Sequence, residues 1–494
     1  MRKSGVLLPV TCLPSKYGIG CFSKSAYDFV DFLEKSHQSY WQILPLGHTG
    51  YGDSPYQAFS AFAGNPYMVS LEKLTDEGLL SKEECDKAYF GSDIHYIDYA
   101  AIYNARFELL RKAYKNSSFS SDEKFREFES ENSHWLEDYC LFMAIKNHFG
   151  GKNYIDWDDD IRSRQSLQRY REFLLDDVNF YKFIQYKFYC QWQDLKAYAN
   201  SKNIKIIGDI PIYVAPDSAD VWSNPELFML DRLGKPSFVA GCPPDGFSPL
   251  GQNWGNPVYN WQRNKDEGYK WWISRISHSF KLYDVLRIDH FRGFEKFYRI
   301  PYGMPDAREG SWENGPGIEL FDAIEKALGK KEIIAEDLGF ITDEVRKLLK
   351  DTGFMGIKVL EFAFDERDGG AFQDYLPHNY PGHCVAYTGT HDNEPISSWF
   401  RNLGANAREN VRRYLWNFYT PENKMYKSLI CSVMHSPASI VILPMWDILG
   451  LGEEARINTP GTFGLNWRWR MSEDMMSEKA IEFLGGITRL YDRI

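Results

Sequence analysis

Residues 283–290 read Tyr-Asp-Val-Leu-Arg-Ile-Asp-His, and this stretch is the best guide to the fold. Residues 283–289 have the length and the Val, Ile and Leu content of a strand that is buried on both faces of a parallel sheet. The strand ends in a carboxylate, Asp289, which a histidine follows. Runs of similar length and composition recur along the chain, so the sequence predicts eight such strands. The other seven cover residues 5–10, 40–45, 204–210, 332–337, 356–362, 383–388 and 439–444.

Segments with helical periodicity separate these runs. Residues 25–37 carry one apolar stripe, and Ser25 is the expected N-cap of this helix. Residues 179–199 and 342–351 show the same three-to-four-residue spacing of apolar side chains. Eight β-then-α units favour an α/β fold in which the sheet closes into a (β/α)₈ TIM barrel. The alternative is an open doubly wound sheet, but no GxGxxG motif follows the first strand.

The whole chain, residues 1–494, is predicted to be a single catalytic barrel with two insertions. The insertion between the second and third strands, over residues 47–203, is mostly helical by its pattern. The insertion after the third strand, over residues 210–283, is rich in Gly, Pro, Asn and Trp. Such a composition is typical of turns, so we expect long ordered loops that border the active-site cleft.

The composition is that of an ordinary globular protein, with 44% apolar and 25% charged residues. The formal net charge of −11 argues against nucleic acid or an anionic membrane as a partner. No apolar run approaches the ~18 residues of a membrane span, and the first one is too short for a secretory signal. The eight cysteines form no CxxC pair, which argues against a disulfide scaffold or a zinc module. We therefore expect a cytoplasmic protein that is a monomer or a weak homo-oligomer.

Aromatic residues make up 16% of the chain, which is the one unusual number in its composition. A well-packed core would account for it. A sugar-binding surface would account for it too, because the C–H faces of a pyranose ring pack well on an aromatic plane. Composition alone leaves both explanations open.

Carboxylates stand at the ends of several predicted strands. Asp289, Glu336 and Asp392 follow the fourth, fifth and seventh strands, and Asp209 lies at the end of the third. In a barrel enzyme these ends meet at one rim, where the active site lies. A single aspartate there often does no more than cap the following helix. Several carboxylates at one rim are costly to bury together, so they favour an active site.

Glycoside cleavage is the metal-free chemistry that requires such carboxylates, one to attack the anomeric carbon and one to protonate the leaving oxygen. Arg287 lies two residues before Asp289 and points the same way, so we expect its guanidinium to hold Asp289 ionised. Glu336 is then the expected proton donor. Asp392 is expected to bind sugar hydroxyls and to stabilise charge. His391 and His290 are its expected supports.

Three blocks of the sequence resemble the signature motifs of the 4-α-glucanotransferases, glycoside hydrolase family 77 of the α-amylase superfamily. These enzymes are also called amylomaltases or disproportionating enzymes. The blocks are Arg-Ile-Asp-His-Phe-Arg-Gly at 287–293, Ala-Glu-Asp-Leu-Gly at 335–339 and Thr-His-Asp-Asn at 390–393. Further similar blocks lie at 45–47, 49–57, 60–67, 208–215, 217–222, 243–257, 458–462 and 466–470.

The resemblance implies a retaining transfer of α-1,4-glucan segments from a maltodextrin donor to a glucose or maltodextrin acceptor. It implies that Asp289 is the nucleophile, Glu336 the general acid/base and Asp392 the transition-state stabiliser. It also implies a covalent glycosyl-enzyme intermediate. We expect no cofactor, and no metal is assigned because the eleven histidines contain no HxxxH pair and no loop has the spacing of an EF-hand. The remaining residues expected to contact the substrate are Arg287, His391, Tyr56, Asp209, Trp254, His290 and Asn393.

Transfer requires that a sugar, rather than water, reaches the intermediate. A loop over residues 241–257, with Phe247 and Trp254 as apolar cover, is expected to exclude water, and the resemblance implies that this loop is mobile. A rigid surface loop braced by prolines is the plainer interpretation. Two other functions remain as alternatives, an α-glucan hydrolase and a glucan-binding barrel without activity.

Overall fold

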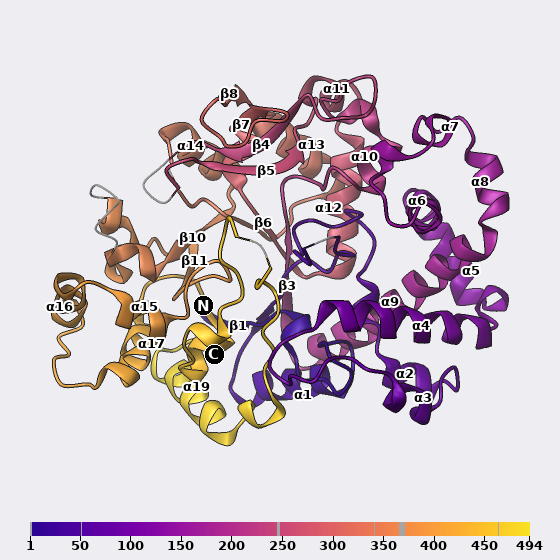
Figure 1. Cartoon of the computed structure of the whole chain (residues 1–494). Helices are drawn as coiled ribbons and strands as arrows, with labels where there is room; N and C mark the ends of the chain where they lie inside the picture. Colours follow the sequence, from indigo (N-terminus) through magenta and orange to yellow (C-terminus); the bar gives the residue numbers. More distant parts are fainter. Residues whose placement is uncertain (1, 51, 245–247, 340, 365–370, 463) are drawn as a thin grey trace.

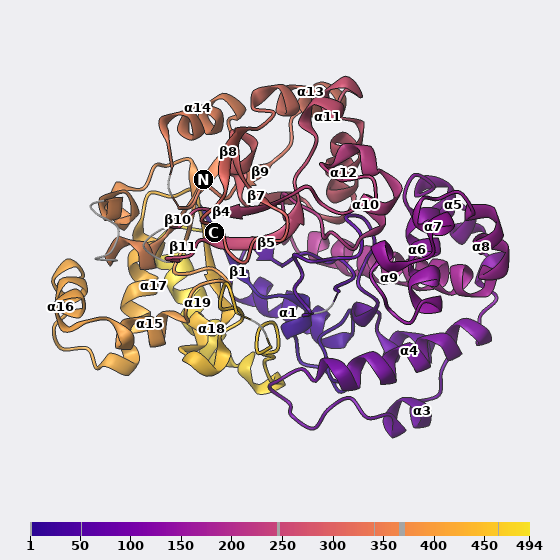
Figure 2. The same ribbon diagram turned by 45° about the horizontal axis from the view of Figure 1, so that its top comes forward.

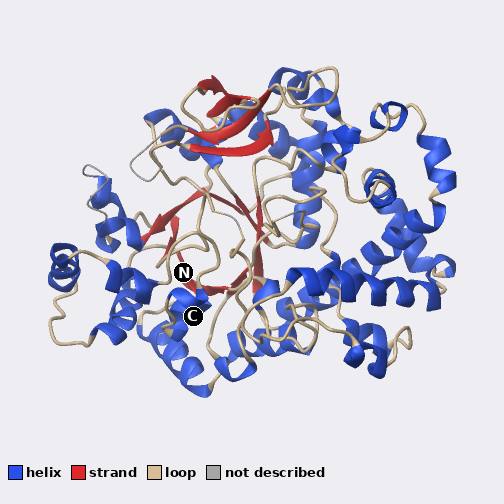
Figure 3. Cartoon of the chain, in the orientation of Figure 1, coloured by secondary structure: helices blue, strands red, loops and turns tan. Residues whose placement is uncertain are grey.

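The computed structural model describes residues 2–50, 52–244, 248–339, 341–364, 371–462 and 464–494. Eight parallel strands close into a barrel in the order β1-β12-β11-β10-β9-β6-β3-β2, which forms the central ring in Figures 1 and 3. The predicted barrel and all eight predicted strands are confirmed, although each observed strand is shorter. The strands are β1 (Lys3–Leu7), β2 (Tyr40–Gln42), β3 (Lys205–Ile210), β6 (Val285–Ile288), β9 (Ile333–Ala335), β10 (Met355–Val359), β11 (Cys384–Tyr387) and β12 (Ile440–Pro444).

The register of β6 decides which side chains share the rim. Arg287 pairs with Asp209 on β3, and Ile288 pairs with Ala335 on β9. All four residues of β6 are buried, as the near-continuous apolar pattern predicts for a strand covered on both faces. The residues that follow Ile288 and Ala335, namely Asp289 and Glu336, therefore leave the barrel next to each other at its carboxyl-terminal end.

Helices surround the barrel. The helix expected over residues 25–37 begins earlier, with Ser23 rather than Ser25 as its N-cap. The helix expected over 342–351 is confirmed, with Thr342 capping its start and Gly353 (φ 68°) ending it in the left-handed region. One of the eight β-then-α units is incomplete, because the described residues between β10 and β11 form only short 3₁₀ turns. The surrounding helices are α1 (Lys24–Lys35), α9 (Leu175–Ser201), α11 (Trp261–Asp266), α12 (Lys270–Leu282), α13 (Ile318–Leu328), α14 (Asp343–Thr352), α15 (Ile396–Asn402), α16 (Ala405–Tyr414), α17 (Met425–His435), α18 (Met445–Leu449) and α19 (Glu478–Leu490).

The insertion between β2 and β3 is mainly helical, as predicted. It forms the purple lobe at the right of Figure 2. Its longest helix, α9, runs back to the barrel and buries Phe188 and Trp192 completely. Its other helices are α2 (Leu71–Asp76), α3 (Lys82–Lys87), α4 (Tyr99–Asn116), α5 (Glu123–Glu131), α6 (Leu136–His148), α7 (Asp159–Arg162) and α8 (Leu167–Phe173).

The loops expected over residues 210–283 are partly wrong. This segment contains a short helix, α10 (Ala219–Ser223), and two strands of an antiparallel sheet. The sheet has the order β5-β4-β7-β8 and is the separate red sheet at the top of Figure 3. Its strands are β4 (Phe238–Cys242), β5 (Gln252–Pro257), β7 (Lys296–Pro301) and β8 (Ser311–Asn314).

Glycine is the reason that this sheet escapes a pattern-based prediction. A Cβ on Gly241 would stand only 2.1 Å from the carbonyl oxygen of Gln252, so β4 and β5 can approach only because a glycine lies there. The same glycine marks a loop in a sequence pattern.

Among the described residues, no helix is long and apolar enough to cross a membrane.

Candidate active site

The predicted carboxylates meet at the carboxyl-terminal rim of the barrel. The backbone N–H of Asp289 donates to the Ile210 carbonyl at 2.9 Å, and that of Glu336 donates to the Ile288 carbonyl at 3.0 Å. These bonds continue the ladders between β3, β6 and β9 by one residue. Asp289 and Glu336 are therefore held by the barrel itself, which fixes them more rigidly than a loop would.

Arg287 joins two of the rim carboxylates. Its Nη1 lies 2.5 Å from Oδ2 of Asp209, and its Nη2 lies 2.8 Å from Oδ1 of Asp289. Asp209 is completely buried, whereas the Asp289 side chain is 27% exposed at the rim. The guanidinium therefore orients Asp289 and leaves part of its carboxylate open to a ligand.

Burial raises the pKa of Asp289 to about 6, even though Arg287 favours the ionised form. Loss of water has the larger effect on this pKa, while Arg287 acts in the expected direction and favours the ionised carboxylate at neutral pH. Burial, together with the charge of Asp289, raises the pKa of Glu336 to about 7. Because Arg287 binds Asp289 directly, Asp289 is the group that ionises first, and its charge then favours the protonated form of Glu336.

The Glu336 carboxyl is oriented by two backbone N–H groups. That of His290 donates to Oε2 at 2.7 Å, and that of Leu338 donates to Oε1 at 2.9 Å. His290 has a left-handed backbone (φ 52°). Burial, with a contribution from Arg292, lowers the pKa of the His290 side chain to about 3, so the imidazole is neutral.

Asp392 follows β11, and its pKa is lowered, whereas those of Asp289 and Glu336 are raised. Burial opposes its ionisation, but His391 and Asn458 outweigh this and lower its pKa to about 2. His391 Nε2 lies 3.3 Å from Oδ2, and Asn458 Nδ2 donates to Oδ1 at 2.6 Å. For His391 burial favours the neutral ring, yet the charge of Asp392 raises its pKa.

Tyr56 forms a wall beside these groups. Its hydroxyl donates to Oδ2 of Asp209 at 2.8 Å, and its ring stacks on His391 with centroids 5.3 Å apart and planes at 17°. Trp467 packs against the rings of both Tyr56 and His391, at 6.0 and 5.9 Å. Asp209, Arg287 and Tyr56 are therefore one hydrogen-bonded unit that reaches the Asp392 side of the rim.

Trp254 lies on the Glu336 side. Its ring meets the His290 ring edge-on at 4.8 Å, and its Nε1–H donates to Oε1 of Gln252 at 3.0 Å. It belongs to β5, so the predicted loop position is wrong for this residue. Phe247, the other predicted cover, lies outside the described residues.

Asn393 occupies the turn beside Asp392. Its Oδ1 accepts from the backbone N–H and the hydroxyl of Thr390, each at 2.9 Å. The structure thus uses this oxygen to shape the turn.

Two residues at the site were not predicted as ligands or supports. Asn458 and Trp467 come from a carboxyl-terminal segment that crosses the rim. Their motif blocks, at 458–462 and 466–470, were visible in the sequence, but nothing in the chain order connects them with Asp392 or Tyr56.

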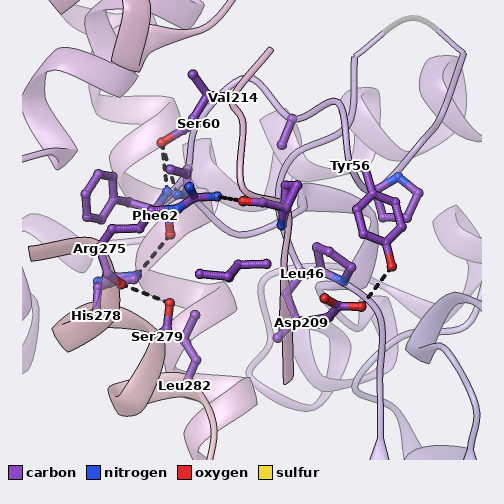
Figure 4. Close-up of a pocket in the computed structure, with 18 of the residues that line it drawn as sticks. Leu46, Tyr56, Ser60, Phe62, Asp209, Val214, Arg275, His278, Ser279 and Leu282 are labelled. Carbon is purple, nitrogen blue, oxygen red and sulfur yellow. Dashed lines mark hydrogen bonds between the residues drawn. The ribbon is translucent and has the colours of Figure 1, made fainter. Parts of the chain in front are cut away.

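A small pocket lies behind the Asp209–Tyr56 wall, as Figure 4 shows. Its volume is about 50 Å³ and its lining includes Arg275 and His278. Ligand pockets have volumes of roughly 300 Å³ or more, so this cavity suits a few water molecules rather than a sugar. Among the described residues, no group of three or more His, Cys, Asp or Glu side chains has the arrangement of a metal site.

Comparison with known proteins agrees with this geometry. The model of the 4-alpha-glucanotransferase family matches residues 8–476. The chain belongs to this family. The 4-alpha-glucanotransferase of Clostridium butyricum is 48% identical over 488 residues, which are 98% of this chain and 99% of the relative. That of Aquifex aeolicus is 45% identical over 497 residues and 100% of both chains.

Solved structures agree. The amylomaltase of Streptococcus agalactiae, solved in complex with acarbose, is 43% identical, and the match covers 100% of both chains with a TM-score of 0.96. The amylomaltase of Corynebacterium glutamicum shares the fold, with a TM-score of 0.80 at 18% identity over 99% of this chain and 75% of its own. The family expected from the sequence motifs is confirmed, and the chain is an enzyme of the 4-alpha-glucanotransferase type. The two alternatives, a hydrolase and an inactive glucan-binding barrel, are not favoured.

Proposed function

We propose that the protein transfers α-1,4-glucan segments by a retaining double displacement, with Asp289 as nucleophile, Glu336 as general acid/base and Asp392 as transition-state stabiliser. One observation carries this assignment. Asp289 and Glu336 sit at neighbouring positions of one rim, burial raises the pKa of both, and the Arg287 guanidinium binds Asp289 directly, so Asp289 is the carboxylate and Glu336 keeps the proton. This is the division of roles that retaining glycoside chemistry requires.

The first step cleaves the donor. Glu336 gives its proton to the glycosidic oxygen while Asp289 attacks the anomeric carbon, so that the C–O bond to the leaving sugar breaks and a glycosyl ester forms on Asp289. Positive charge develops on the sugar ring in the transition state. Asp392, ionised at any pH well above 2, stabilises that charge.

The second step uses the acceptor. Glu336, now ionised, takes the proton of an acceptor hydroxyl, which attacks the anomeric carbon and releases Asp289. Glu336 is protonated again, so the cycle closes without net change in the enzyme. The donor is a maltodextrin and the acceptor is glucose or a maltodextrin.

Transfer prevails over hydrolysis when water is kept from the glycosyl ester. Trp254 and His290 help to exclude water on the acid/base side of the rim, where the centroids of their rings lie 4.8 Å apart. Tyr56 and Trp467 supply further apolar surface on the opposite side. We infer that an acceptor sugar packs between these walls and displaces water. Asp209, Arg287, His391 and Asn393 act as contacts or supports of the same site.

Incubation of the protein with maltotriose, followed by chromatography of the products, tests the proposal. Transfer yields glucose together with maltopentaose and longer chains. Glu336→Gln lowers turnover by at least about 10³-fold while the protein stays folded. Glu332→Gln, at the opposite end of the same strand, is the matched control and keeps normal turnover. Glucose and maltose without longer products, or near-normal activity of Glu336→Gln, contradicts the proposal.

The setting of the reaction is part of the same proposal. All eight cysteines are free thiols, which suits the reducing cytoplasm. We infer a monomer or a weak homo-oligomer whose partners are α-glucans, with no role for nucleic acid or a membrane.

A further inference from the structure

The Asp392 loop, residues 388–396, joins β11 to α15 and carries both His391 and Asp392. Its first and last residues, Thr388 and Ile396, are completely buried. The position of the Asp392 carboxylate at the rim therefore depends on how these two ends are anchored.

One carboxylate anchors both ends. Asp447 Oδ2 accepts from the Thr388 hydroxyl at 2.5 Å, and Oδ1 accepts from the Ile396 backbone N–H at 2.8 Å. Asp447 lies in α18, directly after β12, and β12 pairs with β11. Asp447 has no exposed surface, so it cannot touch a sugar.

A second buried carboxyl packs against the start of the same loop. Glu361 is only 5% exposed, and its backbone N–H donates to the Thr388 carbonyl at 3.3 Å. Its carboxyl also packs against the next residue of the loop, because a Cβ on Gly389 would stand 2.8 Å from Oε1 of Glu361. Glu361 is therefore packed against the start of the loop, beside the Thr388 that Asp447 binds.

Burying two carboxyl groups, Asp447 and Glu361, beside one loop lowers the stability of the folded protein. Burial raises the pKa of Asp447 to about 7, and burial together with the charge of Asp447 raises that of Glu361 far above its usual range. Apolar residues of similar size would fill such a space at less cost to stability. The pair therefore indicates a requirement for a defined loop geometry rather than for stability.

We propose that Asp447 is a positioning residue of the transfer reaction, which fixes Asp392 at the sugar by binding both ends of the Asp392 loop, while Glu361 packs against the start of that loop. The proposal rests on the function proposed above, because it needs Asp392 to act on the reacting sugar. Asp447 itself contacts only the loop.

Thr388→Val tests this proposal, because it removes the hydroxyl that binds Asp447 and keeps the shape of the side chain. A loop that shifts by about 1 Å weakens an interaction made only in the transition state, so kcat falls about 10- to 100-fold while KM stays within about twofold. Thr388→Ser restores the hydroxyl and returns kcat to within about threefold of normal. Asp447→Asn keeps one acceptor and gives an intermediate loss.

A matched control separates positioning from loss of stability. Thr488 is also completely buried, and its hydroxyl donates to Leu484, accepts from Gln38 and lies 3.5 Å from the hydroxyl of Ser4 near the start of β1, at the end of the barrel opposite the rim. Thr488→Val lowers Tm by a similar few degrees and leaves kcat unchanged. A fall in kcat for Thr488→Val equal to that for Thr388→Val would overturn the proposal.

A double-mutant cycle with Asp392→Asn asks whether Thr388 acts through Asp392. The proposal predicts that Thr388→Val costs little more once Asp392 is gone, because both changes remove the same interaction. Additive losses overturn it, as does a normal kcat in Thr388→Val. Wild-type activity of Asp392→Asn overturns the role of Asp392 and this proposal together, whereas an inactive Asp392→Asn with a normal Thr388→Val overturns this proposal alone.

Discussion

Arg287 sets the protonation order of the rim, because its guanidinium is shared between Asp209 and Asp289. The proposed mechanism needs Asp289 ionised and Glu336 protonated. The rate therefore falls below a pH of about 6, as Asp289 takes up a proton, and falls above about 7, as Glu336 loses one. We expect kcat/KM to show a narrow bell-shaped dependence on pH.

Removal of the guanidinium changes this bell in a defined direction. Arg287→Met takes away the positive charge that favours ionised Asp289, so the lower limb moves to higher pH and the maximal rate falls by at least about 10²-fold. Arg169→Met, which removes an exposed ion pair with Asp160 in the helical insertion, is the control and leaves the profile unchanged. A lower limb that stays in place in Arg287→Met contradicts the role given to Arg287.

Asn458 is the residue whose importance the chain order conceals. Its amide donates to Oδ1 of Asp392, and hydrogen bonds to charged groups contribute about 1.5–3 kcal/mol. Asn458→Ala is expected to lower kcat about 10-fold or more with KM nearly unchanged. The control is Asn200→Ala. This change removes a hydrogen bond from a side-chain amide to the Asp284 carboxylate at the opposite end of the barrel strands. Equal kcat values for the two variants would count against this role.

The contrast between Asn458 and Asp289 shows what a sequence can predict about the site. Asp289 was predictable because it follows a buried strand, and the ends of parallel strands meet at one rim. Asn458 and Trp467 were not, because only the packing of the whole carboxyl-terminal segment brings them there. The direction of the Asp289 pKa was also beyond the sequence, since it depends on a balance between lost water and one guanidinium.

The helices and strands also divide into those that the sequence predicts and those that only the fold explains. The barrel strands are predictable because burial on both faces leaves a continuous apolar signature, as in β6 and β12. Strands β4 and β5 carry Gly241, Asn253 and Gly255, which belong to a turn pattern. Pairing across the sheet, rather than intrinsic propensity, makes them strands.

Gly241 gives a direct test of that sheet. Gly241→Ala places a methyl group against the Gln252 carbonyl and pushes β5 away, so Trp254 shifts from His290. We expect a loss of about 1–3 kcal/mol in the free energy of unfolding and a larger share of hydrolysis products from maltotriose. Gly382→Ala, where no atom lies within 4 Å of the added methyl group, is the control for both measurements. An unchanged product ratio in Gly241→Ala contradicts the part given to β5 in excluding water.

For the whole molecule, the first and last barrel strands must meet for the rim to form. β1 pairs with β12 along five residues, from Lys3 opposite Ile440 to Leu7 opposite Pro444. Each of the three carboxylates proposed to be catalytic follows a different strand, so their spacing depends on a closed ring. Closure is therefore the structural condition on which the chemistry depends.

Arg493 stabilises the closed barrel by linking the start of β1 to the segment that leads into β12. It is completely buried, and its guanidinium donates to the carbonyls of Met434, Ser436, Ala438 and Lys3. Arg493→Ala removes a buried donor from these carbonyls and is expected to cost about 3 kcal/mol, seen as a Tm lower by roughly 3 °C. Well below that Tm, kcat stays normal, because the folded barrel still presents the same rim. The exposed Arg489, which contacts His37, is the control, and Arg489→Ala leaves Tm within about 1 °C. If Arg493→Ala instead keeps its Tm and loses kcat, the residue acts on the site and not on the closure of the barrel.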